Sequence, residues 1–148
     1  MEKTTDVIPL QGELKIIVRR RGKVVEEWQD KNLIVNLPRQ RIARLLAEGT
    51  GSLPKITQIA VGTNSTPPSG SDTQITSAFV KPLSGFTYVD PQTVRFDFII
   101  LESEANGKNI VEFGLIAADG TLFARRTRTG AIVKDTDVEI EGSWTIYI

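Results

Sequence analysis

The side chains that could do chemistry in this chain are mainly carboxylates, because its 148 residues include neither histidine nor cysteine. Histidine is the usual general base near neutral pH and the commonest transition-metal ligand, and cysteine thiolate is the usual ligand of structural zinc and iron–sulfur sites. Serine–histidine triads, thiol nucleophiles, zinc–thiolate sites and disulfide bonds are therefore excluded. An enzyme would have to work with carboxylates or lysine, and we predict that the chain is not an enzyme.

Five glutamates are the candidates for a pair of catalytic carboxylates of the kind that glycoside hydrolysis requires. Two of them alternate with apolar residues near the end of the chain, a pattern that places them on the solvent face of a strand. We therefore expect these acids to be solvated rather than catalytic. The five are Glu102, Glu104, Glu112, Glu139 and Glu141.

Cofactor and metal motifs give no stronger signal. Residues 102–109, ESEANGKN, combine carboxylates with Asn and Gly as calcium loops do, but they miss the D-x-D-x-D-G spacing, so we expect an acidic turn. Neither the phosphate-binding pattern G-x-x-x-x-G-K-[ST] nor the nucleophile pattern G-x-S-x-G occurs. The sequence predicts no cofactor, no metal site and no small-molecule ligand.

Three groups of basic residues raise the question of nucleic-acid binding. They are Arg39, Arg41 and Arg44 on a predicted helix, the stretch RRRGK at residues 19–23, and Arg125 and Arg126 beside Phe123. Lys plus Arg equals Asp plus Glu at 18 each, so no net positive field supports phosphate contacts, and one aromatic residue is no stacking platform. Nucleic acid is therefore an unlikely partner, and solvated faces are the expected role.

The elements that must position these residues centre on the stretch from residue 32 to residue 64. Residues 33–35 form a short apolar run typical of a buried strand, and residues 56–61 form another. Between them we predict a helix from about Leu37 to Glu48, with Asn36 as its N-cap and Gly49 as a left-handed C-cap. At about three turns, this helix should depend on burial of its apolar face, Ile42, Leu45 and Leu46, for stability.

Period-two alternation predicts strands on both sides of this stretch. The clearest is the last strand, which Gly142 interrupts with a bulge or a close approach of another residue. Asp119-Gly120 is a strong two-residue hairpin signal, and NSTPPSGSD at residues 64–72 is a surface loop. Further strands are predicted at residues 14–19, 24–28, 75–81, 87–89, 93–101, 110–116, 121–125 and 138–148.

Together these elements predict a mainly β fold. About eight or nine antiparallel strands and one short amphipathic helix indicate a β-sandwich or barrel-like single domain spanning residues 1–148. Residues 1–11 are expected to form an extended N-terminal arm that could reach a neighbouring subunit. No apolar run reaches the length of about 18 residues that a membrane span needs, and no signal peptide is recognisable, so we expect no membrane partner and a cytosolic site of synthesis.

Four segments resemble a family of small structural proteins encoded among the tail genes of tailed bacteriophages and prophages. They read NLIVNLPRQRIARLLAEG, ITQIAVGTNSTPPSGSDTQI, IVEFGLIAADGTLFARRTR and EGSWTIYI, and they fall between Lys31 and Ile148. The chain departs from this pattern at Pro38, where a small residue is expected. The first predicted hairpin lies outside the resemblance.

The resemblance implies a virion component of the tail, collar or baseplate, without catalysis and present in many copies, that could anchor a fibre. It would be made in the host cytoplasm, and its partners would be other copies of itself and other tail proteins. Because ring-like assemblies repeat one contact until it closes, the basic clusters become candidate donors of intersubunit salt bridges. These candidates are Arg19, Arg20, Arg21, Lys23, Arg125, Arg126 and Arg128.

Two other functions stay open. A capsid decoration protein would also be a small β-rich protein without an active site. A carbohydrate- or receptor-binding β-sandwich would present aromatic side chains in its loops, and the candidates are Trp28, Tyr88 and Trp144. An exposed aromatic cluster would favour this last function.

Overall fold

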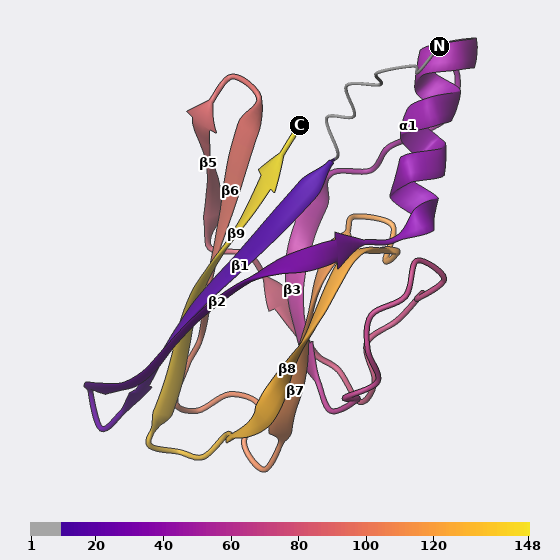
Figure 1. The fold of residues 1–148 in the computed structure, drawn as a ribbon. Coiled ribbons are helices and arrows are strands. Elements are labelled where there is room, and N and C mark those ends of the chain that lie inside the picture. Colours follow the sequence, from indigo (N-terminus) through magenta and orange to yellow (C-terminus); the bar gives the residue numbers. More distant parts are fainter. Residues whose placement is uncertain (1–9) are drawn as a thin grey trace, which may run out of the picture.

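Figure 1 shows a computed structural model of the chain, which describes residues 10–148. Within these residues nine antiparallel strands form one curled sheet, a half-barrel, with a single helix at one end. The predicted mainly β fold with one short helix is confirmed. Of the predicted N-terminal arm, residues 1–9 lie outside the described part, and Gln11 already belongs to a strand.

The strands follow the order β4-β3-β7-β8-β2-β1-β9-β6-β5 across the sheet. Three neighbouring pairs in this order, β7-β8, β2-β1 and β6-β5, are joined by short turns, and the remaining neighbours are joined by longer connections or lie far apart in the sequence. The elements are β1 Gln11–Arg20, β2 Lys23–Ile34, α1 Asn36–Glu48, β3 Ile56–Gly62, β4 Phe79–Pro82, β5 Gly85–Asp90, β6 Thr93–Ile100, β7 Asn109–Ala117, β8 Leu122–Val133 and β9 Val138–Tyr147.

Strand β2 connects the two halves of the sheet. It pairs with β1 over most of its length, from Lys23 to Asn32, and its last two residues, Leu33 and Ile34, pair with β8. The sequence predicted two separate strands here, at residues 24–28 and 33–35. They are one strand, because the chain keeps its direction while its hydrogen-bonding neighbour changes from β1 to β8 after Asn32.

The edge strands β4 and β5 follow each other in the chain, with only Leu83 and Ser84 between them. The N–H of Leu83 donates to the carbonyl oxygen of Thr57 at 3.0 Å, and Thr57 belongs to β3, the neighbour of β4. The N–H of Ser84 donates to the carbonyl oxygen of Asp97 in β6 at 2.8 Å. The chain therefore crosses from one edge of the curled sheet to the other within two residues.

The core lies inside the curl and is built by the alternation that the sequence predicted. Leu14, Ile16 and Val18 of β1 are at most 4% exposed, and Trp144 of β9 is fully buried. Burial of each such side chain contributes roughly 1.5–3 kcal/mol, so this face supplies most of the stability. Other members of the cluster are Ile34, Ile59, Val61, Phe96, Phe98, Ile100, Ile110, Phe113, Leu115, Phe123, Ala124, Ile132, Val138, Ile140 and Ile146.

A second, small cluster joins Val35, Ala60 and Leu122 to Ile75 of the loop between β3 and β4. The strand predicted from residue 75 is wrong at its start, because β4 begins only at Phe79. Ile75 instead packs where Gly62 and Gly114 lack side chains, since a Cβ on either glycine would come within 2.5–2.7 Å of it. The loop is thus held on the sheet by an apolar anchor.

Helix α1 has nearly the predicted bounds. Gly49 adopts a left-handed conformation with φ 64° and closes the helix, as predicted. The predicted N-cap is wrong by one residue, since Val35 holds that position and Asn36 is already helical. The N–H of Asn36 finds its acceptor outside the helix, in the carbonyl oxygen of Gly70 at 2.9 Å.

The expected burial of the helix's apolar face is wrong. Leu46 is 83% exposed, Ile42 and Leu45 are only half-buried, and the buried residue of the helix is Pro38. The helix projects from one end of the half-barrel instead of being enclosed by strands (Figure 1). Its apolar face is therefore left largely in contact with solvent.

Arginines attach the helix to the sheet in place of apolar packing. The guanidinium of Arg39 donates to the carbonyl oxygens of Ile34 at 3.2 Å and Leu10 at 3.0 Å. Arg41 donates to Asp119 at 3.0 Å and to Thr121 at 3.1 Å, beside the β7–β8 turn. Two of the three helix arginines thus have partners outside the helix, whereas the third, Arg44, lies 3.9 Å from Glu48 on the helix itself.

The close approach predicted at Gly142 is present, because a Cβ there would overlap the ring of Phe98 on the neighbouring strand. We expect Gly142→Ala to lower the free energy of unfolding by about 1–3 kcal/mol, since Phe98 is buried and has no space to move into. Urea denaturation measures this. Gly85→Ala is the matched control, because nothing lies within 4 Å of its added Cβ. Equal effects at the two positions would refute the packing explanation.

Candidate assembly surface

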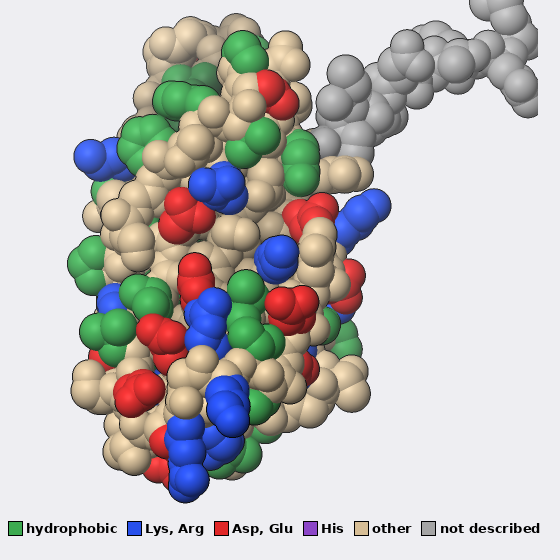
Figure 2. Space-filling model, turned by 90° about the vertical axis from the view of Figure 1, so that its left-hand side faces the viewer, with side chains coloured by type: hydrophobic (Ala, Val, Ile, Leu, Met, Phe, Trp, Pro, Cys, Tyr) green, Lys and Arg blue, Asp and Glu red, His purple; other side chains and the backbone are tan. Residues whose placement is uncertain are grey.

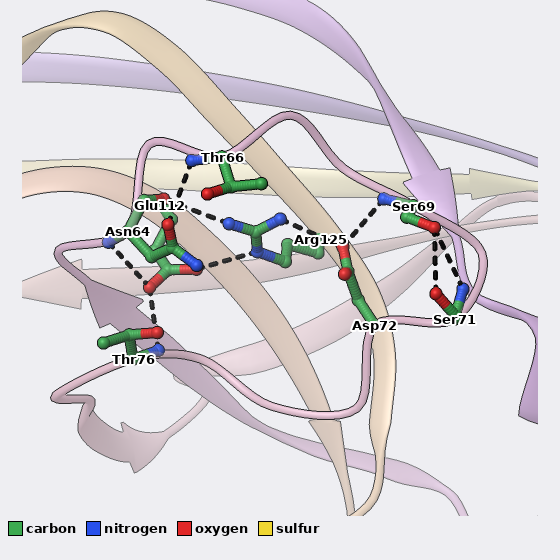
Figure 3. A network of polar contacts seen from close by, with 8 residues as sticks. All are labelled: Asn64, Thr66, Ser69, Ser71, Asp72, Thr76, Glu112 and Arg125. Carbon is green, nitrogen blue, oxygen red and sulfur yellow. Dashed lines mark hydrogen bonds and ion pairs between the residues drawn. The ribbon is translucent and has the colours of Figure 1, made fainter.

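Arg125 of β8 is the centre of a buried polar network (Figure 3). Its Nε donates to Glu112 Oε2 at 2.7 Å, its Nη1 to Asp72 Oδ2 at 2.9 Å and its Nη2 to the carbonyl oxygen of Asn64 at 3.0 Å. The side chains of Arg125 and Glu112 are 2% and 0% exposed. Each guanidinium nitrogen therefore has an acceptor, which is the condition for burying such a pair at low cost.

Glu112 also fixes the loop that covers it. Its Oε1 accepts hydrogen bonds from the backbone N–H groups of Asn64 at 3.1 Å and Thr76 at 2.8 Å. Asp72 accepts a further bond from the N–H of Ser69 at 2.8 Å. A loop without regular secondary structure is thus held on the outer face of β7 and β8 by one charged cluster.

The expectation that Arg125 donates an intersubunit salt bridge is wrong. Its guanidinium is buried and fully bonded within the chain, so a partner cannot reach it. Charge reversal there would unfold the loop instead of acting on assembly alone. The sequence placed Arg125 on a solvated strand face because the loop that covers that face lies about 50–60 residues earlier in the chain.

Arg126 and Arg128 lie against the indole ring of Trp28, with guanidinium carbons 5.9 and 5.4 Å from the ring centroid. Each also pairs with an acid of β2, Arg126 with Asp30 and Arg128 with Glu26, both at 2.5 Å. The side chain of Arg128 is only 6% exposed and that of Arg126 is 29% exposed. These side-chain contacts join β2 to β8 beyond the two residues where their backbones pair. Because Arg128 is nearly buried, it has little surface for a partner.

The first basic cluster, residues 19–23, lies at the β1–β2 turn. Arg19 pairs with Glu141 at 2.5 Å, and Arg20 pairs with Asp137 at 2.9 Å. Arg21 is 84% exposed with Asp137 at 3.6 Å, and Lys23 is exposed as well. Exposed pairs of this kind contribute about 0–1 kcal/mol each, so these side chains are free to rearrange towards a partner. Their intersubunit role stays a prediction.

Figure 2 shows the distribution of charged and hydrophobic side chains on the face that β5 and β6 occupy in Figure 1. Lys and Arg side chains gather at the bottom, the end with the β1–β2 turn, and hydrophobic side chains are spread in small groups over the rest of the face. Acidic and basic side chains alternate across its middle. The densest basic surface on this face is therefore at the end with the β1–β2 turn.

The glutamates considered as catalytic candidates do not converge. Glu112 is bonded to Arg125, Glu104 pairs with Lys81 at 2.7 Å, and Glu139 and Glu141 both face Arg19. The backbone oxygen of Glu102, the fifth candidate, accepts a bond from Lys134. Within residues 10–148, no group of three His, Cys, Asp or Glu side chains is arranged to hold a metal ion.

Glu104 belongs to a second cluster, near the loop between β6 and β7. Burial of Glu104 acts to raise its pKa, but hydrogen bonds from Lys81 and the N–H of Leu101, with the charges of Lys81 and Lys134, hold that pKa below its ordinary value. Lys134 is buried, which lowers its pKa, and its Nζ donates to Asn106 at 2.8 Å. The cluster fixes the loop as the Arg125 network fixes residues 63–78.

The end of the molecule that carries α1 and the β5–β6 turn exposes apolar side chains. Phe86 is 61% exposed and Tyr88 is 71% exposed, with their rings edge to face and centroids 5.6 Å apart. They line a groove of about 520 Å³ that also includes Ile42 of α1, Leu53 and the C-terminal Ile148. Apolar surface that is open to solvent and continuous in this way is a candidate contact site for another molecule.

The aromatic residues named from the sequence have different positions. Trp144 is fully buried, and Trp28 is half-buried with two arginines against its ring. Tyr88 is exposed, and its neighbour in the groove, Phe86, is a surface residue that sequence reasoning missed. The signal was present in GFTYVD, where two aromatics alternate along a strand with no charge before Asp90.

No helix within residues 10–148 is long and apolar enough to cross a membrane. Comparison with known proteins finds no matching family model, no matching curated protein and no matching solved structure. The function of the chain must therefore be inferred from its own residues and their geometry.

Removing the charge of Glu112 tests the buried network. Glu112→Gln keeps the side chain's size but leaves Arg125 buried without its closest counter-charge, so we expect the free energy of unfolding to fall by about 3 kcal/mol. Glu141→Gln is the control, because the Arg19–Glu141 pair is accessible to solvent, with side chains 28% and 51% exposed, and surface pairs contribute at most about 1 kcal/mol. Urea denaturation of both variants measures the difference, and similar losses would show that the network contributes no more than a surface pair.

The lowered pKa of Glu104 predicts a pH dependence. Because its folded pKa lies below the ordinary value of 4.5, ionised Glu104 stabilises the fold above pH 4.5, and this contribution is lost as the pH falls through the folded value. The difference in unfolding free energy between wild type and Glu104→Gln should therefore shrink below about pH 4.5. Urea midpoints of both proteins from neutral to acid pH measure it. A difference that stays constant would rule out this linkage.

Proposed function

We propose that this chain is a non-enzymatic structural subunit of a bacteriophage virion, located in the tail, collar or baseplate and assembled in several copies. Its partners are other copies of itself and other tail proteins. The proposal starts from the resemblance of four sequence segments to tail-associated proteins, and the geometry of those segments supports it.

One observation carries the proposal: three of the four segments meet in a single structural unit. The β3 strand with its loop contributes Asn64 and Asp72, and the β7–β8 hairpin contributes Glu112 and Arg125 to the buried network. The end of β2 pairs with β8 at Leu33. The residues that carry the resemblance are thus used to hold a fold together, which is the role expected of a packing subunit.

The distribution of surface groups supports the same function. Most charged side chains of the basic clusters have partners within the chain, whereas the apolar groove at the α1 end is open. Protein interfaces are enriched in aromatic side chains and depleted of charge at their centres. This end therefore offers surface for packing against another protein.

Localisation tests the proposal directly. Particles assembled from the gene cluster that encodes the chain are purified, and a gold-labelled antibody against the chain is followed by electron microscopy. Label on the tail, collar or baseplate is the expected result, with several copies per particle by quantitative mass spectrometry. Label confined to the head would favour a capsid decoration protein, and absence from purified particles would contradict a virion role altogether.

The exposed Phe86 and Tyr88 favour one second candidate, a carbohydrate- or receptor-binding module. Aromatic faces bind sugar rings, and these two rings lie beside an open groove. Their edge-to-face arrangement provides no flat platform, which makes this the weaker candidate. Saturable binding of a host-surface glycan, lost in Tyr88→Ala, would establish it in place of the structural role.

A further inference from the structure

The two edge strands of the sheet are protected very differently. Strand β4 has four residues, and it carries Lys81 and Pro82, two residues by which natural sheets block edge-to-edge pairing. Strand β5 has six residues, all exposed, and carries no charge before Asp90. Its one pairing partner among residues 10–148 is β6, so its other edge leaves backbone donors and acceptors open.

We propose that β5 pairs antiparallel with β5 of a second copy of this chain, about a two-fold axis, to form one continuous sheet. A strand edge is complementary to itself in this arrangement, because both copies contribute the same alternation of N–H and C=O groups. The inference rests on the proposed function in taking copies of the chain to be neighbours in an assembly. It deepens that function by naming the surface through which they meet.

The side chains of β5 select the register. Opposite residues of an antiparallel pair lie on the same face, and Phe86 and Tyr88 already share a face of β5. A register with Thr87 opposite Thr87 therefore places Phe86 of each copy opposite Tyr88 of the other. Two aromatic cross-strand pairs form, on the face that also lines the groove.

Charge permits this contact between identical molecules. The chain has formal net charge zero, so two copies do not repel each other globally. In the register centred on Thr87, Asp90 of one copy falls opposite Ser84 of the other, so the two acids lie at opposite ends of the paired strands. Like charges would face each other only if a charge were placed at residue 87.

The area involved predicts a weak dimer. An aromatic side chain buries roughly 150–250 Å² when fully covered, so the four exposed rings of a pair would bury several hundred Å². A stable interface buries about 1,200–2,000 Å² in total. Association through β5 should therefore depend on concentration and be favoured where copies are held close together.

Charge at residue 87 provides the test. Sedimentation velocity over a range of concentrations is expected to show reversible self-association of the wild-type chain. Thr87→Lys and Thr87→Glu each place like charges opposite each other, and each should weaken association by about tenfold or more. An equimolar mixture of the two variants places opposite charges together and should restore association to near the wild-type level.

Val80→Lys is the matched control, because Val80 is an exposed residue, 42% accessible, on the other edge strand. It should leave association unchanged, and circular dichroism should show that all variants fold. The proposal is overturned if the wild-type chain stays monomeric at all concentrations, if Thr87→Lys associates as wild type does, or if the mixture does not recover. It is also overturned if deletion of residues 2–9 abolishes association while Thr87→Lys leaves it intact.

These outcomes are independent of the localisation experiment. Absence of the chain from particles would refute the virion role while β5 pairing in solution still stood. Conversely, a chain found in tails whose Thr87 variants associate normally would keep the virion role and lose this interface.

Discussion

A β-sheet that curls without closing leaves two edge strands with unpaired backbone N–H and C=O groups. How well each edge strand is protected determines where another molecule could pair with the sheet. The half-barrel brings β4 and β5 together at Leu83 and Ser84, which bond to opposite halves of the sheet. Strand β4 is short and carries Pro82, whereas β5 is longer, uncharged up to Asp90 and lined with aromatics. The fold thus protects one edge and leaves the other available, beside an apolar groove and an exposed helix.

The arginines of β8, in contrast, bond to acids and backbone groups within the chain. Arg125 and Glu112 are buried and hold residues 63–78 against the outer face of the sheet, and Gly62 and Gly114 leave the room that the loop needs. Arg126 and Arg128 join β8 to β2, where backbone pairing covers only two residues. These three arginines therefore stabilise the fold itself, and the exposed basic side chains among the candidate donors are those near the β1–β2 turn.

Local patterns predicted most of the sheet, and long-range contacts account for the errors. Alternation placed β1 and β9 correctly, and the turn at Asp119-Gly120 and the close approach at Gly142 were identified because both leave local marks. The predicted length of that turn is wrong, since four residues rather than two separate β7 from β8. Burial of Arg125 could not be predicted, because the covering loop comes from a distant part of the chain. The amphipathic pattern of α1 predicted a packed helix, but pattern alone does not say whether the sheet has a surface to receive it. Leu46 is exposed for that reason.

The central claim is that β5 is the edge at which copies of the chain meet. Amide hydrogen exchange of β5, followed as a function of protein concentration, tests it most directly. The outward-facing amides of β5 should exchange more slowly as the concentration rises through the range in which the chain associates, while those of β4 keep their rates. Exchange in β5 that does not change with concentration while the chain demonstrably associates would contradict the account.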